Sequence, residues 1–297
     1  MSAGAPVFRV AVVGVGNMGS AMAANLLERG WPVHVCDLVP QRAQDLVPFG
    51  AVAVSTPALA AAGCVAVIVC VVDASQCEDV LFGPHGVAAV MQAGQLVMLC
   101  PTMAPQDTEA LAQRLAERGI ATLDAPMSGG PARARDGSMS LMVAGADAVF
   151  TRYKPLLDAL SSTVFNIGTR IGDGARTKLV NNLAAGINLV GAAEVLAMAR
   201  KMGLDLATTL AVIERSSGQS WIGSDRLHRA IAGDFAPRAH MTLLEKDTRL
   251  AVQAAQAAGF EGPLGGIARD VFAGACAGGL ADRDDAAVLQ WLTRAAS

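Results

Sequence analysis

A glycine-rich loop near the N-terminus constrains the fold of this chain more than any other feature of the sequence. The segment VFRVAVVGVGNMGSAM places Gly14, Gly16 and Gly19 in the spacing GxGxxG, after a strand-like valine run and before a helical stretch. The first glycine permits a tight turn, the second lets a pyrophosphate approach the backbone, and the third lets helix and strand pack closely. The loop therefore predicts a dinucleotide-binding fold. Its expected cofactor-binding residues are Gly14, Gly16, Asn17, Met18 and Gly19.

An acidic residue follows at the position where a dinucleotide-binding fold needs one. Asp37 ends the second predicted strand, about twenty residues after the loop, where a carboxylate binds the ribose hydroxyls of NAD. That carboxylate would repel a 2′-phosphate, so NAD is favoured over NADP. Arg42 weakens the preference, because a nearby arginine can receive the phosphate of NADP. From the sequence alone, a surface or capping role for Asp37 stays open.

The pattern of apolar residues changes near the middle of the chain. The first half alternates β-branched runs with helical stretches, and near-continuous Val and Ile runs are typical of strands buried on both faces of a parallel sheet. After Gly168 helical periodicity dominates. We therefore expect a doubly wound Rossmann-type α/β domain over residues 1–168 and an all-helical domain over 169–297. Strands are predicted at 7–14, 32–37, 51–54, 64–72, 95–100, 120–125, 138–145 and 163–168, and C-terminal helices at 174–202, 205–215, 222–232, 239–258, 263–275 and 284–295.

Composition and charge exclude several classes of protein. The net charge is −3, and the absence of a basic run argues against a nucleic-acid partner. The longest apolar run, residues 64–72, is too short to span a bilayer, and the N-terminus lacks the pattern of a secretory signal. A cytoplasmic protein without membrane contact is therefore expected. The 6 cysteines form no CxxC pair and the 4 histidines show no ligand spacing, so no metal site is expected.

Two further segments carry chemistry that the fold alone does not require. In DAPMSGG, the backbone N–H groups of Ser128, Gly129 and Gly130 suit a substrate carboxylate, although an ordinary turn explains the same residues. In TKLVNN, Lys178 and Asn182 share one helix face, so they would present an ammonium and an amide to the same space. The alternative for Lys178 is a surface lysine whose stem covers apolar neighbours.

The four segments GVGNMGSAMAANLL, DAPMSGG, GDGARTKLVNN and LLEKD, in this order, resemble the motifs of the β-hydroxyacid dehydrogenase family. The resemblance covers nearly the whole chain, and CDLVPQRA is faintly similar to members that act on sugar acids, such as L-threonate dehydrogenases. It implies an NAD-dependent oxidoreductase that oxidises a small hydroxy acid, or reduces the matching keto or semialdehyde acid. Pro101, Glu245 and the run Val71-Val72-Asp73 depart from the usual family pattern.

The resemblance also implies roles for individual residues. Lys178 corresponds to the general acid/base, and Asn182 to the partner that orients the substrate, with Asn181 as a competing position. Lys246 would contact the cofactor near its nicotinamide. The other implied residues are Ser128, Gly129, Gly130 and Gln219 for the substrate, and Val71, Val72 and Thr102 for the cofactor.

The implied reaction transfers a hydride from a carbinol carbon to the cofactor while a base takes the hydroxyl proton. A lysine does this at neutral pH only if desolvation or a nearby positive charge lowers its pKa. Two alternatives stay open: imine reduction on the same scaffold, against which Lys178 argues, and a non-catalytic NAD-binding interaction protein. The long alanine-rich helix predicted at 174–202 favours a homodimer or homotetramer.

Overall fold

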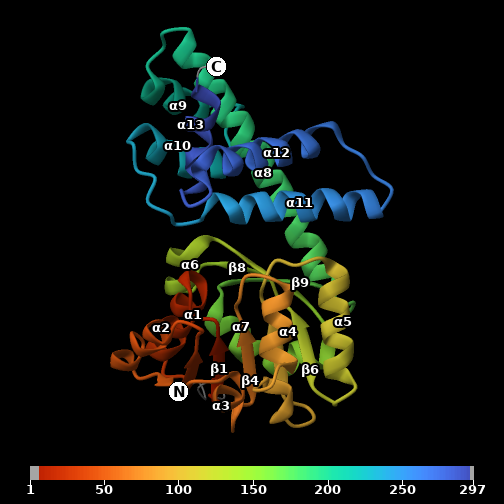
Figure 1. Ribbon diagram of the computed structural model, residues 1–297. Helices are drawn as coiled ribbons and strands as arrows, with labels where there is room; N and C mark the ends of the chain where they lie inside the picture. Colours follow the sequence, from red (N-terminus) through yellow and green to blue (C-terminus); the bar gives the residue numbers. More distant parts are fainter. Residues whose placement is uncertain (1–6, 295–297) are drawn as a thin grey trace. The chain divides into compact units, whose positions relative to one another are not determined.

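The chain forms two compact units in the computed structural model, which describes residues 7–294 (Figure 1). The first unit ends at Lys178 and contains the strands of the described chain. The second begins at Leu179 and is helical. The long helix α8 (Asp173–Lys201) begins in the first unit and continues in the second. The predicted combination of a Rossmann-type α/β domain and a helical domain is confirmed.

Among the described residues, one nine-stranded sheet organises the first unit in the order β3-β2-β1-β4-β5-β6-β8-β7, with β9 paired to β8. The strands from β3 to β6 are parallel, whereas β8 runs antiparallel to β6 and β7. The strand order reverses between β1 and β4, and ligands of such sheets bind in the crevice beyond the carboxyl ends of the strands there. The strands are β1 (Val10–Val13), β2 (Val33–Cys36), β3 (Val52–Ala53), β4 (Ala66–Val69), β5 (Leu96–Leu99), β6 (Ala121–Asp124), β7 (Met127–Ser128), β8 (Ser140–Ala144) and β9 (Thr163–Gly168).

The strand β7 and the antiparallel pairing were not predicted from the sequence. β7 lies inside DAPMSGG, where the residues indicated only a turn. Met127 pairs with Leu141, and Ser128 with Ser140, so this segment is held along the edge of β8. Two residues between a proline and a glycine pair carry no alternating pattern, and their partner strand alone makes them extended.

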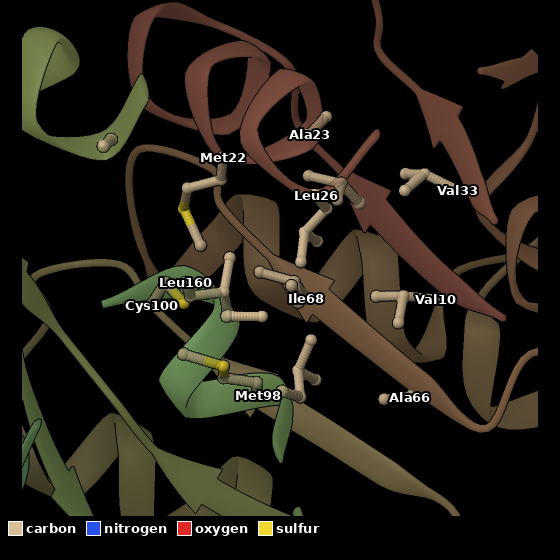
Figure 2. Packing of buried hydrophobic residues seen from close by; sticks show 14 of the residues in the cluster. Val10, Met22, Ala23, Leu26, Val33, Ala66, Ile68, Met98, Cys100 and Leu160 are labelled. Atoms are coloured by element: carbon tan, nitrogen blue, oxygen red, sulfur yellow. The ribbon is translucent and has the colours of Figure 1, made fainter. Parts of the chain in front are cut away.

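The apolar strands are buried because helices cover the sheet. Every residue of β1, β4 and β5 is at most 2% exposed. Figure 2 shows Met22 and Leu26 of α1 (Asn17–Glu28) in the same cluster as Val10 and Ile68 from adjacent strands. Fully burying one such side chain contributes about 1.5–3 kcal/mol. The other helices of this unit are α2 (Pro40–Gln44), α3 (Pro57–Ala61), α4 (Ala74–Phe82), α5 (Pro105–Ala116), α6 (Gly130–Asp136) and α7 (Asp147–Leu160).

The second unit packs shorter helices against α8. Its separate core includes Leu189 and Leu196 of α8 together with Phe272 from α12. By length and composition α8 could cross a membrane, with a window of mean hydropathy 1.4 that is 39% buried, but the core helix of a soluble protein meets the same criterion. The other helices are α9 (Leu206–Glu214), α10 (Trp221–Ile231), α11 (Met241–Ala257), α12 (Pro263–Ala275) and α13 (Val288–Thr293).

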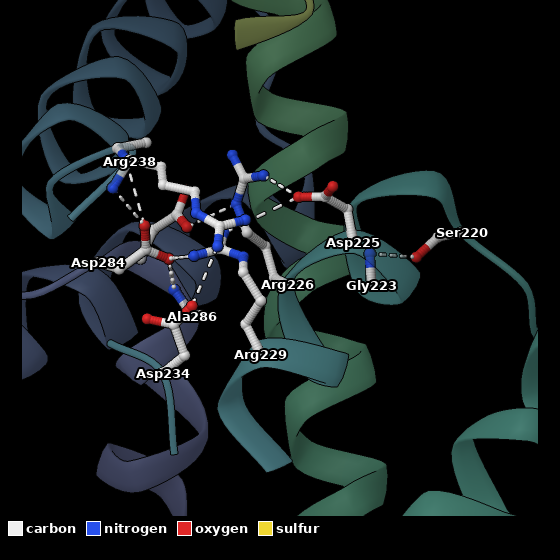
Figure 3. A network of polar contacts seen from close by, with 11 residues as sticks. Ser220, Gly223, Asp225, Arg226, Arg229, Asp234, Arg238, Asp284 and Ala286 are labelled. Atoms are coloured by element: carbon white, nitrogen blue, oxygen red, sulfur yellow. Dashed lines mark hydrogen bonds and ion pairs between the residues drawn. The ribbon is translucent and has the colours of Figure 1, made fainter. Parts of the chain in front are cut away.

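A buried network of ion pairs also holds the second unit together (Figure 3). Asp284 is fully buried; one of its carboxylate oxygens lies 2.9 Å from a guanidinium nitrogen of Arg229, which is itself 8% exposed. The backbone N–H groups of Arg238 and Ala239 donate to the other oxygen at 2.8 and 3.2 Å. These contacts fasten α10 to the chain segments before α11 and α13.

Candidate active site

The glycine loop has the backbone geometry that the sequence predicted. Gly14 adopts a φ of +88°, a conformation that favours glycine, and its N–H donates to the carbonyl of Cys36 at 2.9 Å. A Cβ on Gly19 would lie 1.9 Å from the Gly14 carbonyl oxygen, so the start of α1 touches the turn. A Cβ on Gly16 would meet no atom within 4 Å. Gly14 and Gly19 are thus required by the fold, whereas Gly16 faces the open space that a pyrophosphate would fill.

Asp37 braces this loop and can still receive a ligand. Its two carboxylate oxygens accept one N–H each, from Val15 and from Val39, both at 2.8 Å. Arg42 lies 3.5 Å from the same carboxylate, and its side chain is 54% exposed. Each carboxylate oxygen has a further lone pair for a ribose hydroxyl. The loop and Asp37 therefore fit a dinucleotide, and the capping role considered for Asp37 coexists with that fit.

The other predicted cofactor residues follow neighbouring strands. Val71 and Val72 come after β4, and Thr102 after β5, at the edge where the carboxyl ends of the parallel strands meet. Val71 contacts Gly14, because a Cβ added to that glycine would lie 2.9 Å from its side chain. The N–H of Val72 donates to Gln76 at 3.0 Å. The structure thus brings these residues to the same edge of the sheet as the glycine loop.

The predicted carboxylate-binding turn has two glycines with positive φ. Gly129 has a φ of +131° and Gly130 of +74°. A Cβ on Gly130 would meet nothing within 4 Å, whereas one on Gly129 would lie 2.9 Å from the side chain of Arg133. The backbone of the turn is therefore open on the Gly130 side. Arg135, which follows the turn in α6, forms an ion pair with Glu28 on α1.

Lys178 lies in the second turn of α8 and is only 9% exposed. Such burial argues against the alternative of a surface lysine. The first turn of α8 is held by Asp124, the last residue of β6, which accepts N–H donors from Gly172 and Ala175 at 2.9 and 3.0 Å. Burial raises the pKa of Asp124 to about 6, although the backbone donors oppose the shift. Asp124 stands in DAPMSGG, and the only sequence signal for these contacts is an aspartate at the end of an apolar run.

In the second unit, Asn182 is fixed by two hydrogen bonds. Its amide nitrogen donates to Asp247 at 2.6 Å, and its amide oxygen accepts from Asn181 at 3.0 Å. Asn182 is 9% exposed, whereas Asn181 is exposed. Lys246 lies 3.4 Å from the carboxylate of Asp247. Asp247 stands in the segment LLEKD, and no sequence signal indicates its contact with Asn182.

Gln219 differs from the other predicted substrate residues. It lies before α10, is exposed, and its N–H donates to the carbonyl of Ser216 at 3.3 Å. This hydrogen bond joins two residues of the loop before α10 and does not connect Gln219 to another element.

Comparison with known proteins agrees with this geometry. Residues 9–168 match the family model described as the NAD binding domain of 6-phosphogluconate dehydrogenase. Residues 172–292 match the model described as the NAD-binding domain of NADP-dependent 3-hydroxyisobutyrate dehydrogenase. The chain is 37% identical to an L-threonate dehydrogenase of Cupriavidus necator, over 95% of both chains.

Solved structures lead to the same family. A crystal structure of 3-hydroxyisobutyrate dehydrogenase from Salmonella typhimurium matches with a TM-score of 0.90 and 35% identity, covering 95% of this chain and 99% of that one. An imine reductase of Streptomyces aurantiacus matches with a TM-score of 0.66 and 24% identity, covering 97% of this chain and all of that one, which shows a shared fold only. The chain therefore belongs to the β-hydroxyacid dehydrogenase family, to which 3-hydroxyisobutyrate dehydrogenase is related, and is an NAD(P)-dependent oxidoreductase of small hydroxy acids.

Proposed function

We propose that the enzyme oxidises L-threonate, a four-carbon sugar acid, with NAD⁺ as the preferred cofactor. The observation that carries the substrate is the 37% identity to an L-threonate dehydrogenase over 95% of both chains. The preference for NAD⁺ is supported by Asp37, whose carboxylate ends β2 with its side chain 7% exposed. A 2′-phosphate there would meet a fixed negative charge, which the half-exposed Arg42 offsets only in part.

Lys178 is proposed as the general base of the reaction. The bound cofactor would supply the acceptor for the hydride that leaves the carbinol carbon. The amine of Lys178 takes the proton that the substrate hydroxyl must lose as the hydride leaves. Its 9% exposure supports a base that is shielded from bulk water.

The turn Ser128–Gly130 is proposed to hold the substrate carboxylate. Its support is the open space beside Gly130 and the positive φ of both glycines, since successive backbone N–H groups in such turns can form an anion-binding concavity. The hydroxyl of Ser128 adds one further donor. Gln219 is kept as a candidate contact for the rest of the substrate, and Lys246 as a cofactor contact.

Asn182, rather than Asn181, is proposed to orient the substrate. A primary amide offers two N–H donors and two lone pairs. Asp247 uses one donor of Asn182, and Asn181 uses one lone pair. One donor and one acceptor are left in a fixed orientation, which suits the positioning of a hydroxyl or carboxylate group.

The test is the absorbance of NADH at 340 nm with NAD⁺ or NADP⁺ and a panel of hydroxy acids. We expect turnover with L-threonate and NAD⁺, and Lys178→Ala should lower kcat by about 10²–10⁴-fold while NAD⁺ binding stays unchanged. Near-normal turnover of Lys178→Ala would refute the assigned base. If L-threonate is not oxidised but another acid of the panel is, the proposed substrate is refuted and the proposed reaction is not.

A second candidate substrate is 3-hydroxyisobutyrate. It is favoured by the structure from Salmonella typhimurium, which shares 35% identity with this chain. The two acids differ in polarity, since threonate carries two further hydroxyl groups and 3-hydroxyisobutyrate a methyl group. The ratio of their kcat/KM values decides between them.

We also propose that the enzyme is a cytoplasmic homodimer or homotetramer. The second unit has a groove of about 450 Å³ lined by residues that include Phe260 and Leu264, which are 63% and 57% exposed. Ile267, 58% exposed, lies on the same helix as Leu264. Exposed apolar clusters of this kind mark contact surfaces. Light scattering after size exclusion measures the mass, and Ile267→Glu should lower it if this face forms the contact.

A cytoplasmic location is supported by the state of the cysteines. All 6 cysteines are free, and four of them, Cys36, Cys64, Cys77 and Cys100, are buried. Disulfides are rare in reducing compartments. Fractionation of cells that express the protein tests the location.

A further inference from the structure

One buried carboxylate lies between two parts of the proposed site. These parts are the start of α8, which carries Lys178, and the strand that leads to the turn Ser128–Gly130. Asp124 is 2% exposed and lies at the carboxyl end of β6. One of its oxygens, Oδ2, accepts the N–H groups of Gly172 and Ala175, at 2.9 and 3.0 Å. These two donors belong to the residues that start α8, and they lie 48 and 51 positions away in the sequence. A single side-chain oxygen therefore anchors the helix start to the sheet.

The surroundings of Asp124 are those of a structural anchor. Its hydrogen-bond partners are backbone N–H groups rather than a guanidinium or ammonium group. The titratable groups that face it are the carboxylate of Asp173 and the thiol of Cys100. Asp173 is neutralised separately by Arg170 and Arg176, at 2.6 and 3.1 Å. The carboxylate of Asp124 therefore binds the start of α8 and takes no part in an ion pair with another described residue.

The helix start also lies against the backbone of the sheet without a gap. A Cβ on Gly174 would lie 2.8 Å from the carbonyl oxygens of Asp124 and Met142, closer than real Cβ atoms approach backbone atoms. Met142 in turn donates its N–H to Pro126 at 2.9 Å. The same strand segment, therefore, touches Gly174 and holds the backbone that leads to Ser128.

Lys178 is carried directly by this anchored turn. It follows Gly174 by four residues, and at a rise of about 1.5 Å per residue it lies about 6 Å along the helix from the point of contact. An α-helix is stiff over such a distance, so a shift of the first turn moves the lysine by a similar amount. A misplacement of about 1 Å can lower a rate by about 10²-fold.

We propose that Asp124 is a positioning residue, which sets the place of Lys178 relative to the turn Ser128–Gly130 by fixing the first turn of α8. This inference rests on the proposed roles of Lys178 and of that turn. The proposal gives Asp124 no contact with substrate or cofactor. Its action is geometric: an acceptor oxygen at the position of Oδ2 is required, whereas the negative charge is not.

Five variants of the full chain separate these points. Asp124→Leu removes the acceptor at similar size, and Asp124→Asn keeps an acceptor oxygen without the charge. Gly174→Ala forces the helix start away from the strand while the acceptor side chain of Asp124 stays in the sequence. Gly191→Ala is the matched control, because Gly191 lies on the same helix and a Cβ there would meet no atom within 4 Å. Lys178→Ala is the reference for loss of the base.

The measurements are kcat and KM for oxidation of L-threonate and of 3-hydroxyisobutyrate, the Kd for NAD⁺, and the Tm. We expect Asp124→Leu and Gly174→Ala to lower kcat by about 10–100-fold, with the Kd for NAD⁺ within about twofold of the wild type. Asp124→Asn and Gly191→Ala should keep kcat within about threefold. A purely structural role would lower the Tm of the first two variants and leave the kcat of the folded protein unchanged.

Three outcomes would overturn the proposal. The first is a folded Asp124→Leu or Gly174→Ala protein with wild-type kcat; if Asp124→Leu does not fold, Gly174→Ala decides. The second is a folded Asp124→Asn protein that loses kcat as strongly as Asp124→Leu, since the charge would then matter. The third is an active Lys178→Ala protein, which would remove the proposed base as well. An inactive Lys178→Ala beside normal Asp124→Leu and Gly174→Ala would refute this inference alone.

Discussion

Two buried carboxylates, one in each unit, differ in what compensates for their burial. Asp124 in the sheet is 2% exposed, Asp284 in the helical unit is fully buried, and both accept backbone N–H groups. Only Asp284 also faces a guanidinium group, that of Arg229, at 2.9 Å. The pKa of Asp124 is raised to about 6 by burial, whereas the hydrogen bonds from Arg229 and the backbone lower that of Asp284 to about 2 against the same effect of burial.

At Asp124, hydrogen bonds from backbone N–H groups do not offset the cost of removing the carboxylate from water. At Asp284 the guanidinium of Arg229 and the backbone donors together outweigh burial, whereas burial raises the pKa of the neighbouring Asp285 to about 7 although Arg226 lies 2.7 Å away. The ionised form of Asp284 therefore stabilises the fold, and the ionised form of Asp124 destabilises it. A buried carboxylate that lowers stability at neutral pH, at the start of the helix bearing Lys178, is consistent with a functional need for its acceptor oxygen rather than for its charge.

The largest effect is expected when the buried carboxylate of Asp284 is removed, because the guanidinium of Arg229 then keeps, among the described residues, only the more distant Asp225, at 3.8 Å. Asp284→Ala leaves the guanidinium of Arg229 buried without its carboxylate, which costs about 3–5 kcal/mol in the free energy of unfolding. Urea unfolding followed by circular dichroism measures the loss. The double variant with Arg229→Met is the control, because replacing both charges by apolar groups is often nearly neutral. A single variant as stable as the wild type would contradict this account of the cluster.

The pH dependence of this contribution has a defined sign. The pKa of Asp284 is about 2 in the folded chain, below the value of about 3.9 for an unperturbed aspartate. The unfolded chain therefore binds more protons in this range, so the stabilisation is present above about pH 4 and is lost as the pH falls toward 2. The difference in stability between wild type and Asp284→Ala should shrink over that interval, and a difference independent of pH would argue against an ionic contribution.

A smaller effect of opposite sign is expected for Asp124→Asn. The pKa of Asp124 is about 6 in the folded chain and about 3.9 when unfolded, so its contribution to stability is present below about pH 4 and is lost as the pH rises through 6. At pH 7 the neutral amide should therefore raise the free energy of unfolding by about 1–3 kcal/mol. Urea unfolding at pH 7 and pH 4 measures this gain, which should vanish at the lower pH. A loss of stability at pH 7 would show that the charge itself holds the helix start.

The smallest effect concerns two glycines of α8. Gly191→Ala adds a methyl group in open space and improves helix propensity, which should raise the free energy of unfolding by about 0.5–1 kcal/mol. Gly174→Ala should lower it instead, because the added Cβ meets backbone carbonyl oxygens at 2.8 Å. Equal Tm values for the two variants would show that the contact at Gly174 yields without strain.

The sequence predicted well the features that depend on local pattern. The loop Gly14–Gly19 and the strands that flank it follow from residue spacing, and α8 follows from apolar periodicity and the absence of proline. The contacts of Asp124 with Gly172 and Ala175 could not be predicted, because they join positions 48 and 51 residues apart. Periodicity does not reveal which strand edge a helix start will meet.

The choice between neighbouring asparagines illustrates the same limit within the candidate site. Helical spacing places Asn182 on the face of Lys178 but says nothing of the partners of Asn181 or Asn182. The structure separates them through Asp247, which lies 65 positions away and binds the amide nitrogen of Asn182. The buried ion pair of Arg229 and Asp284 was missed for the same reason, since each residue alone reads as a solvated charge.

The open space beside Gly16 makes that position a place where folding and ligand binding can be uncoupled. A methyl group there would collide with nothing in the protein, since no atom lies within 4 Å of the added carbon. The same methyl group would occupy the volume that the phosphates of the coenzyme need. We therefore expect Gly16→Ala to fold like the wild type and to lose its affinity for the dinucleotide, so that it serves as the reference protein in calorimetric titrations.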